Sequence, residues 1–454
     1  MAGEESETDK TTTTAVVYTK KQKIMIVSIL LIQFFAGSCL STPAPFLPKL
    51  SEKHNIGSSL TGVILSLLSA GMLIFSPICG KLMTGKISPR TMLLAGIFTM
   101  GVSSVLFGLL AYFPIPSADS GINYWFLVAA LAIRLLMAVG TTAVFTSGST
   151  IFAISFKDNS TTVLSYIETA IGLGVMAGPA LGSGFYKAGG FMLTFSGIGT
   201  ISILMFFTLV FVFPYTDASD ADEGQAASYK WIFLQPNISL SFLCTVVTGL
   251  MWTSLDPVLE PELRKKFGLE EEICALIFIV LSVMYTVATA IVGKVFEKWK
   301  QVDSLKVLFL GLLLASLAFA MLGPSPFIPG LPRPLWVLLI CLGVLGAAFG
   351  ALVVPCLNLL LSPESGPESL NDASKAVIMG IWNSAFSLGD LTGPIISGTV
   401  AEYSGFGWAM TACSLTSLTI AVVVVIFKMY RRRQRSPDLK GPDEERRSLL
   451  ATNS

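Results

Sequence analysis

The stretch GVMAGPALGSG at residues 174–184 decides how this sequence folds. Gly174, Gly178 and Gly182 are spaced by four residues, so in a helix they lie on one face and let a neighbouring helix approach closely. Pro179 removes one backbone hydrogen bond from that helix and permits a bend. Close helix pairs of this kind are typical of proteins whose helices pack inside a membrane.

The glycine stretch lies within one of twelve long apolar runs. Of the 454 residues, 53% are hydrophobic and only 13% are charged, whereas a soluble chain carries about 25% charged residues. Each run can cross about 30 Å of hydrocarbon, so the sequence predicts an all-α membrane protein with twelve transmembrane helices. The runs lie at roughly 24–46, 59–80, 91–112, 124–153, 162–186, 193–214, 236–257, 273–293, 305–323, 335–361, 376–399 and 406–427.

Weak internal repeats divide the runs into two sets of six. The stretch GDLTGP, which begins at Gly389 in the eleventh run, repeats the pattern of the fifth run. The loops after the second and eighth runs also begin alike, at Gly80 and Gly293. Such repeats are typical of transporters whose site lies between two halves. The predicted parts are a disordered N-terminus at 1–23, a six-helix bundle at 24–214, a linker at 215–235, a second six-helix bundle at 236–428 and a tail at 429–454.

Lys and Arg gather on the side of the membrane where the two termini lie. The short loops 81–90 and 294–306 carry this bias, as do the residues that flank the first and last runs. Because short loops rich in Lys and Arg stay in the cytosol, both termini are predicted to be cytosolic.

Composition excludes several classes of function. A net charge of +1 provides no global field for nucleic acid. The seven cysteines show no metal-ligand spacing, and the only histidine, His54, is expected in a loop, which excludes a buried histidine relay. No nucleotide-binding loop or catalytic triad is recognisable. We therefore expect no enzyme activity, no cofactor and no metal, and a monomer surrounded by lipid.

The glycine stretch, with Gly184 at its end, resembles the antiporter motif in the fifth helix of the major facilitator superfamily. Arg134, followed by small residues in the fourth run, resembles a motif of that family's fourth helix. Gly80 begins the loop between helices 2 and 3 as in the family, but Thr84 stands where the family has an Asp. The resemblance covers nearly the whole chain. It implies two six-helix bundles that expose a central site alternately to the two sides of the membrane.

Three further stretches resemble the vesicular amine transporters of that family, in particular their polyamine-carrying branch. They are LSYIET at 164–169, LDP at 255–257 and EERRSLL at 444–450. The resemblance implies exchange of protons for organic cations such as spermine and spermidine. The first run lacks the Asp of the monoamine and acetylcholine branches and offers Gln33 and hydroxyl side chains instead, which argues against a neurotransmitter carrier.

Ionisable residues inside the apolar runs are the natural site candidates, because a charge in hydrocarbon is costly unless it pairs or faces water. Glu168, in the fifth run, is interpreted as a carboxylate that exchanges a proton for a cationic amine. Alternatively it is a structural ion-pair partner of Arg134, which cannot itself carry the proton. Both interpretations hold if protonation breaks that pair.

Three other acids complete the predicted site. Asp256 and Glu260 are spaced by four residues and are expected on one helix face, where they would suit a molecule with several positive charges. Alternatively they belong to a solvated helix end, since the basic residues 264–266 follow at once. Asp390, in the eleventh run, has no basic residue near it in its own helix and is a second candidate for the proton site.

The tail carries an acidic dileucine pattern formed by Glu445, Leu449 and Leu450, which a sorting adaptor in the cytosol would read as an address. Together these features predict a proton-coupled antiporter that moves organic cations, polyamines or related amines, into secretory or endolysosomal vesicles. Its expected partners are the cation, protons, membrane lipid and the adaptor. The alternatives are a multidrug/proton exporter of the plasma membrane and a non-transporting receptor with a transporter fold.

Overall fold

The computed structural model describes residues 19–116, 121–156, 160–214, 229–269, 271–299, 302–323, 334–361 and 371–438. The dileucine residues Glu445, Leu449 and Leu450, most of the predicted N-terminal segment and linker, and the end of the tail lie outside this part of the chain. Across the described ranges the regular structure is helical, and no strand occurs in them. The all-helical fold class is therefore confirmed.

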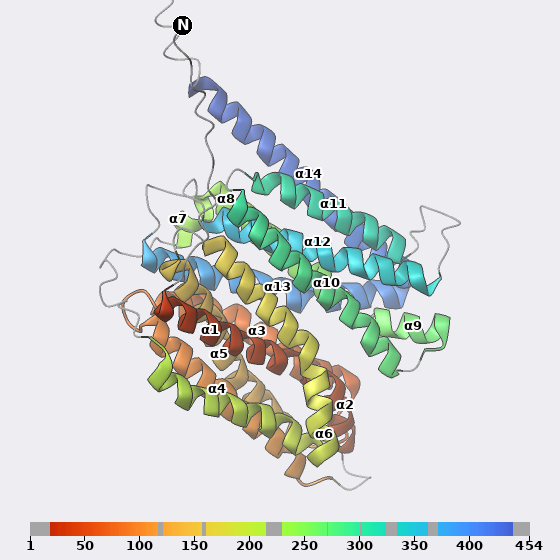
Figure 1. Ribbon diagram of the computed structural model, residues 1–454. Coiled ribbons are helices and arrows are strands. Elements are labelled where there is room, and N and C mark those ends of the chain that lie inside the picture. The colour runs from red at the N-terminus through yellow and green to blue at the C-terminus, as the bar shows by residue number, and fades with distance from the viewer. Residues whose placement is uncertain are drawn as a thin grey trace, which may run out of the picture.

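The helices fall into two groups along the chain (Figure 1). The first group comprises α1 (Lys20–Ser41), α2 (Pro43–Lys53), α3 (Ser58–Leu82), α4 (Pro89–Leu109), the 3-10 turn η1 (Leu110–Tyr112), α5 (Tyr124–Ser155) and α6 (Ser160–Val212). A short helix, α7 (Tyr229–Leu234), precedes the second group. That group comprises α8 (Pro236–Thr253), α9 (Leu259–Phe267), α10 (Glu271–Lys298), α11 (Ser304–Leu322), α12 (Leu335–Leu361), α13 (Asp372–Ser404) and α14 (Phe406–Asp438).

Nine helical segments among the described residues are long and apolar enough to cross a membrane. One of them, α6, has 53 residues and is broken at Gly189 and Gly190, whose backbones leave the helical region. Gly190 takes a positive φ of 65°, which a residue without a Cβ adopts readily. The chain reverses here, because Thr194 Oγ1 donates to the carbonyl oxygen of Gly182 at 3.5 Å, whereas twelve residues of straight helix would span about 18 Å. Pro179 lies within the helical part of α6, so the sharp bend comes at the glycine pair instead.

Each group packs mainly within itself. In the first group α1 lies along α6, while α4 contacts both α5 and α6. In the second group α12 contacts α10 and α11, and α13 lies along α8. Figure 1 shows the first group, coloured red to yellow-green, below the second group, coloured green to blue. The two groups meet mainly along two helix pairs, α3 with α13 and α6 with α10.

Candidate functional site

The glycine face of α6 packs directly on α1. A Cβ on Gly174 would overlap the carbonyl oxygen of Phe34, and a Cβ on Gly178 would come within 2.7 Å of the carbonyl oxygen of Ser38. Ser38 Oγ donates a hydrogen bond to the carbonyl oxygen of Gly174 at 3.1 Å across the same contact. Gly184 differs, because a Cβ there would meet nothing within 4 Å. The contact with α1 therefore fixes the position of the residues that precede Gly174 in α6.

Glu168 lies in that preceding part of α6 and points toward the second group of helices. Tyr285 of α10 donates its phenolic hydrogen to Glu168 Oε2 at 3.1 Å, and the indole of Trp382 in α13 lies beside the same carboxylate. Among the described residues no Lys or Arg forms an ion pair with Glu168. One acid of the first group is thus held by a neutral donor of the second.

Tyr285, which holds this carboxylate, belongs to a cluster of aromatic rings in the second group. The ring of Trp252 meets that of Tyr285 edge to face, with centroids 5.0 Å apart, and lies 5.5 Å from the ring of Phe349. Tyr285 and Trp382 are buried. A carboxylate next to aromatic faces can bind an alkylammonium ion through charge and cation–π attraction together.

Arg134 does not pair with Glu168. Its guanidinium is buried and donates to the carbonyl oxygens of Ile64 and Leu65 in α3, at 3.2 Å each. Its charge also lies over the ring of Phe107, at 5.8 Å from the centroid. The sequence placed Arg134 and Glu168 in neighbouring helices, but their side chains point to different partners. Arg134 therefore joins α5 to α3 inside the first group.

Asp390 of α13 lies at the other meeting of the two groups. It accepts a hydrogen bond from the hydroxyl of Ser69 in α3. Asp256, in the turn after α8, lies close enough to Asp390 for their charges to interact. Thr253 Oγ1 also donates to the main-chain oxygen of Asp390 at 3.3 Å. Asp256 and Asp390 therefore form an acidic pair, and no described Lys or Arg makes an ion pair with either.

Glu260 does not belong to this pair. The expectation that Asp256 and Glu260 share one helix face is wrong, because α8 ends at Thr253 and α9 begins only at Leu259. Glu260 instead pairs with Arg264 at 3.3 Å on an accessible face of α9. The alternative interpretation of a solvated helix end therefore describes Glu260 better.

The contact of α3 with α13, here called the α3–α13 seam, is built from backbone. A Cβ on Gly80 would come within 2.7 Å of the carbonyl oxygen of Ala376, and a Cβ on Gly380 within 2.6 Å of that of Ser76. Ser384 Oγ of α13 donates to the carbonyl oxygen of Leu73 at 2.8 Å. The hydrogen bond between Ser69 and Asp390 continues the seam.

The contact of α6 with α10, here called the α6–α10 seam, joins the corresponding helices of the repeat. Gly293 lies against the side chain of Ser165, and Thr162 Oγ1 donates to the carbonyl oxygen of Gly293 at 3.2 Å. Tyr285 and Glu168 continue this seam along the same two helices. Each seam thus contains a close glycine contact followed by a carboxylate that accepts from a hydroxyl.

Both seams close the side of the molecule on which α1 begins. Because the long helices alternate in direction, α3 and α10 end on that side, and α6 and α13 begin there. Gly80 and Gly293 lie near the ends of α3 and α10, while Ala376 and Ser165 lie near the beginnings of α13 and α6. Close contacts therefore hold the two groups together on this side.

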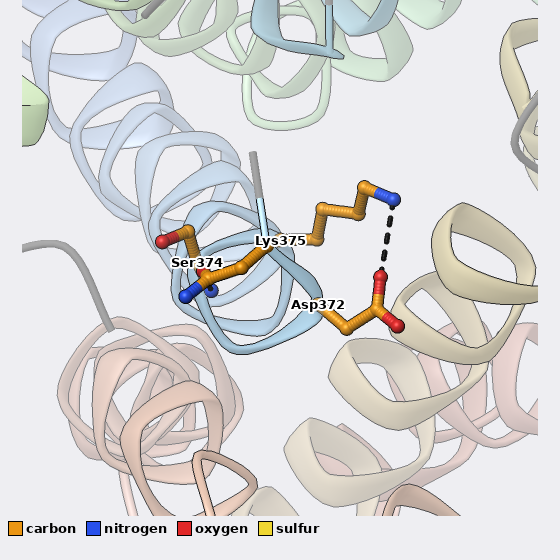
Figure 2. Close-up of polar contacts among 4 residues, drawn as sticks. Asp372, Ser374 and Lys375 are labelled. Carbon is orange, nitrogen blue, oxygen red and sulfur yellow. Dashed lines mark hydrogen bonds and ion pairs between the residues drawn. The ribbon is translucent and has the colours of Figure 1, made fainter. Parts of the chain in front are cut away.

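The beginning of α13 carries an ion pair on the closed side. Asn371 caps the helix by accepting from the amide of Ser374 at 2.8 Å. Lys375 Nζ lies 3.2 Å from Asp372 Oδ1, and both side chains are largely buried. Figure 2 shows these two side chains turned toward each other on one side of α13, with Ser374 on the other side.

The hydroxyl donors of the two seams were not predicted from the sequence. Tyr285 and Ser69 hold the two predicted acids, and Thr146 of α5 lies 3.0 Å from Ser76 Oγ and 3.4 Å from Asn383 Nδ2. The only signal for these residues is a polar side chain within an apolar run, which is common between membrane helices.

Comparison with known proteins agrees with this architecture. The family model described as Major Facilitator Superfamily matches residues 29–362 and 241–453. The chain is 28% identical over 442 residues to the MFS-type transporter SLC18B1 of Mus musculus, which covers 96% of this chain and 94% of that protein. The protein of the same name from Homo sapiens is 27% identical over 437 residues, covering 95% of this chain and 92% of that protein.

Two further relatives are more distant. A multi-drug resistance efflux pump PmrA homolog of Lactococcus lactis is 24% identical over 413 residues, which cover 88% of this chain and 94% of that protein. The crystal structure of the human organic anion transporter MFSD10 (TETRAN) superimposes with a TM-score of 0.68 at 16% identity, over 89% of this chain and 100% of that chain. At this identity the superposition shows a shared fold.

Proposed function

The chain belongs to the major facilitator superfamily and is a multi-pass membrane transporter, and from this premise we propose that it exchanges protons for organic cations. The proposed cargo is a polyamine such as spermine or spermidine, or a related amine. The proposed destination is the lumen of a secretory or endolysosomal vesicle. The similarity to SLC18B1 proteins along nearly the whole chain is consistent with this proposal but names no substrate.

The observation that carries the proposal is the surroundings of Glu168. Its carboxylate lies where α6, α10 and α13 meet, held by the neutral phenol of Tyr285 and beside the neutral indole of Trp382. An acid within a membrane span that has no basic partner can take up either a proton or a cationic amine. Asp390 is a second acidic position within a span, with Asp256 nearby in the exposed turn after α8.

We also propose twelve spans in two bundles, with both termini in the cytosol. The nine apolar segments count α6 once, although its break at Gly189 and Gly190 makes it an antiparallel pair. Two further helices are not among the nine segments. Helix α8 has 18 residues, barely enough to cross a membrane, and the 33-residue α13 is made less apolar by Asn383 and Asp390. Adding these three spans gives twelve, the even number that two termini on one side require.

In the proposed cycle the two groups rock against each other along the seams. Lumenal protons would neutralise the acids and release the cation, and loss of the protons on the cytosolic side would prepare the site for the next cation. Glu168 and Asp390 are suited to such coupling because each accepts from the opposite group of helices. Protonation would weaken these two hydrogen bonds at the same time as it lowers the affinity for the cation.

The test is uptake by purified protein in liposomes with an imposed pH gradient, with spermine, spermidine, serotonin and acetylcholine as cargo. Glu168→Gln should reduce gradient-driven uptake by about 5- to 150-fold, which corresponds to a typical coupling free energy of about 1–3 kcal/mol. Glu402→Gln, a substitution of an exposed acid near the end of α13, is the matched control and should leave uptake unchanged. Undiminished uptake by the Glu168 variant would refute the proposal, and binding of cargo without flux by the unmodified protein would favour a receptor.

The second candidate function is a multidrug/proton exporter at the plasma membrane, which the similarity to the Lactococcus efflux pump homolog favours. The two candidates differ in where the protein resides. In the vesicular proposal a cytosolic sorting adaptor reads Glu445, Leu449 and Leu450. Replacing Leu449 and Leu450 by Ala should then move the protein to the cell surface. A protein that resides at the surface before this substitution would favour the exporter.

A further inference from the structure

His54, the only histidine of the chain, is buried although sequence analysis expected it in a loop. It caps the end of α2, one residue beyond the first apolar segment, Lys20–Lys53. Its ring stacks on that of Phe126 in α5, with centroids 4.0 Å apart and an angle of 16° between the planes. His54 lies outside the helices, as predicted, but the start of α5 covers its ring.

The hydrogen bonds around His54 favour one neutral form of its ring. Asn123, the N-cap of α5, has its Oδ1 occupied by the amide of Phe126 at 3.2 Å, and its Nδ2 donates to the carbonyl oxygen of Pro114 at 3.0 Å. The same Nδ2 lies 3.2 Å from His54 Nδ1, so Nδ1 is the acceptor. The proton of the neutral ring is then on Nε2, which is buried and has no hydrogen-bond partner among the described residues.

A second proton on the ring would therefore break this side-chain link, which supplements the main-chain hydrogen bond from the Asn123 amide to the carbonyl oxygen of His54 at 3.2 Å. It would bind to Nδ1 and place a donor against the amide donors of Asn123. Turning the Asn123 amide over would not help, because that would lose its hydrogen bonds to both Phe126 and Pro114. The imidazolium charge would also be buried without a carboxylate beside it among the described residues, and the face of Phe126 would offset only part of that cost.

The charged groups near His54 do not compensate for such a charge. Among the described residues, α2 itself carries Lys49, Glu52 and Lys53, and Lys53 is the one whose charge acts on the ring. The packed segments 110–116 and 121–130 and the first ten residues of α3 contain no Asp, Glu, Lys or Arg. Burial, and then the charge of Lys53, lower the pKa of His54 below its ordinary value. Asp119 lies outside the described residues.

We propose that His54 is a second proton-binding site, on the side of the membrane opposite the seams, whose protonation releases α2 from the beginning of α5. Helix α2 also contacts α6, through the stacked rings of Phe46 and Tyr186 with centroids 4.9 Å apart. A freed α2 would therefore loosen the end of the first group that lies opposite the seams, beside the glycine face of α6. If the proposed vesicular function holds, this side is the lumen, and an acid lumen would release α2.

Because His54 is the only histidine, the full-length protein without a histidine tag gives a single histidine signal in NMR. In detergent or nanodiscs, labelled histidine should titrate with a midpoint clearly below about 6.5, the ordinary value for a free side chain. Asn123→Asp keeps a capping oxygen for α5 and places a negative charge beside the ring, so it should raise the midpoint. Asp119→Asn should leave the midpoint unchanged. A midpoint at or above 6.5 in the unmodified protein would overturn the proposal.

Hydrogen exchange tests the release itself. After correction for the intrinsic effect of pH, amides at 121–127 should exchange faster in the unmodified protein at pH 5 than at pH 7.5. His54→Gln keeps an acceptor but cannot be charged, so exchange in that variant should not respond to pH. An equal response in both proteins, or none in the unmodified one, would refute the release. Neither measurement depends on transport, so a failure here is distinct from a failure of the proposed function.

Discussion

The two seams join equivalent helices of the two groups, but they are built from different atoms. In the α3–α13 seam, Gly80 and Gly380 lie against carbonyl oxygens of the opposite helix. In the α6–α10 seam, Gly293 lies against the side chain of Ser165. Backbone atoms of a helix cannot move without the helix, whereas a side chain can be shortened or turned. The α3–α13 seam therefore fixes the spacing of its helices more strictly than the α6–α10 seam does.

The acids of the two seams also differ in position. Glu168 comes ten residues before Gly178 in α6, but Asp390 comes only three residues before the equivalent Gly393 in α13. The position in α13 that corresponds to Glu168 is occupied by Asn383, whose amide reaches Thr146 at 3.4 Å. The repeat thus conserves the helix pairs and the glycine contacts while it places the two carboxylates at different depths. A proton entering from one side would meet them at different points of its path.

The largest expected effect on transport is that of adding one methyl group to the α3–α13 seam. Gly380→Ala should prevent full closure, because the new Cβ would lie 2.6 Å from the main-chain oxygen of Ser76. Overpacking of this kind costs about 1–3 kcal/mol, which here falls on the closed state alone. Uptake in liposomes should fall about 5- to 150-fold, by the same conversion of free energy to population. Gly184→Ala is the control and should be silent, because its Cβ would meet nothing within 4 Å.

In the α6–α10 seam, a second substitution should rescue the effect of replacing a glycine by alanine. Gly293→Ala would overlap the hydroxyl of Ser165, so it should also impair uptake. Adding Ser165→Gly removes the overlapping atoms and should restore most of the activity, whereas no side-chain truncation can relieve Gly380→Ala. If the double variant stays as impaired as Gly293→Ala alone, the proposed difference between the seams is wrong.

A smaller effect is expected from the hydroxyl donors. Tyr285→Phe and Ser69→Ala each remove a hydrogen bond between the two groups of helices, with a net cost of about 0.5–1.5 kcal/mol to the closed state. Distances between spin labels on α3 and α13, and on α6 and α10, would report the closed population. Because the donors lie in different seams, the effects of the two substitutions should add. A change in distance confined to the seam that carries the substitution would mean that the two seams open separately and not as one unit.

The sequence predicted the acids better than it predicted their partners. Glu168 and Asp390 were recognisable because an acid is rare in an apolar run, and helix periodicity assigned the glycines to one face. Which side chains these residues contact depends on how each helix is rotated about its axis and shifted along it, and sequence periodicity does not reveal either. Arg134 is in the expected helix, yet its guanidinium turns to the carbonyl oxygens of Ile64 and Leu65.

Short breaks in helices limited the prediction in a second way. The seventh run was expected to reach residue 257, but α8 ends at Thr253, and this separates Asp256 from Glu260. The covering of His54 by Phe126 likewise depends on how the start of α5 meets the end of α2. Hydropathy identifies membrane segments but not the residue at which each helix ends. Asp256 and His54 lie just beyond such ends, and Glu260 lies in the first turn of the next helix, α9.

The smallest expected effect on the seams comes from an ion pair within one group. Asp303 caps α11 by accepting from the amide of Leu305 at 3.0 Å, and Lys428 of α14 lies 2.6 Å from its other oxygen. Burial alone would raise the pKa of Asp303, but the hydrogen bonds and charge of Lys428, with the amides of α11, lower it below the ordinary value. The pair therefore stabilises the protein above about pH 3.9, and this contribution is lost as pH falls through the lowered value.

Asp303→Asn keeps the capping oxygen and loses the ion pair. Thermal unfolding at pH 7 should show a loss of about 1 kcal/mol or less, because the pair is partly accessible to water. The difference from the unmodified protein should persist down to pH 5 and shrink below pH 4. Spin-label distances across both seams should not change, because α11 and α14 lie in the same group. A shift in those distances would mean that packing within the second group, and not the seams alone, sets the closed state.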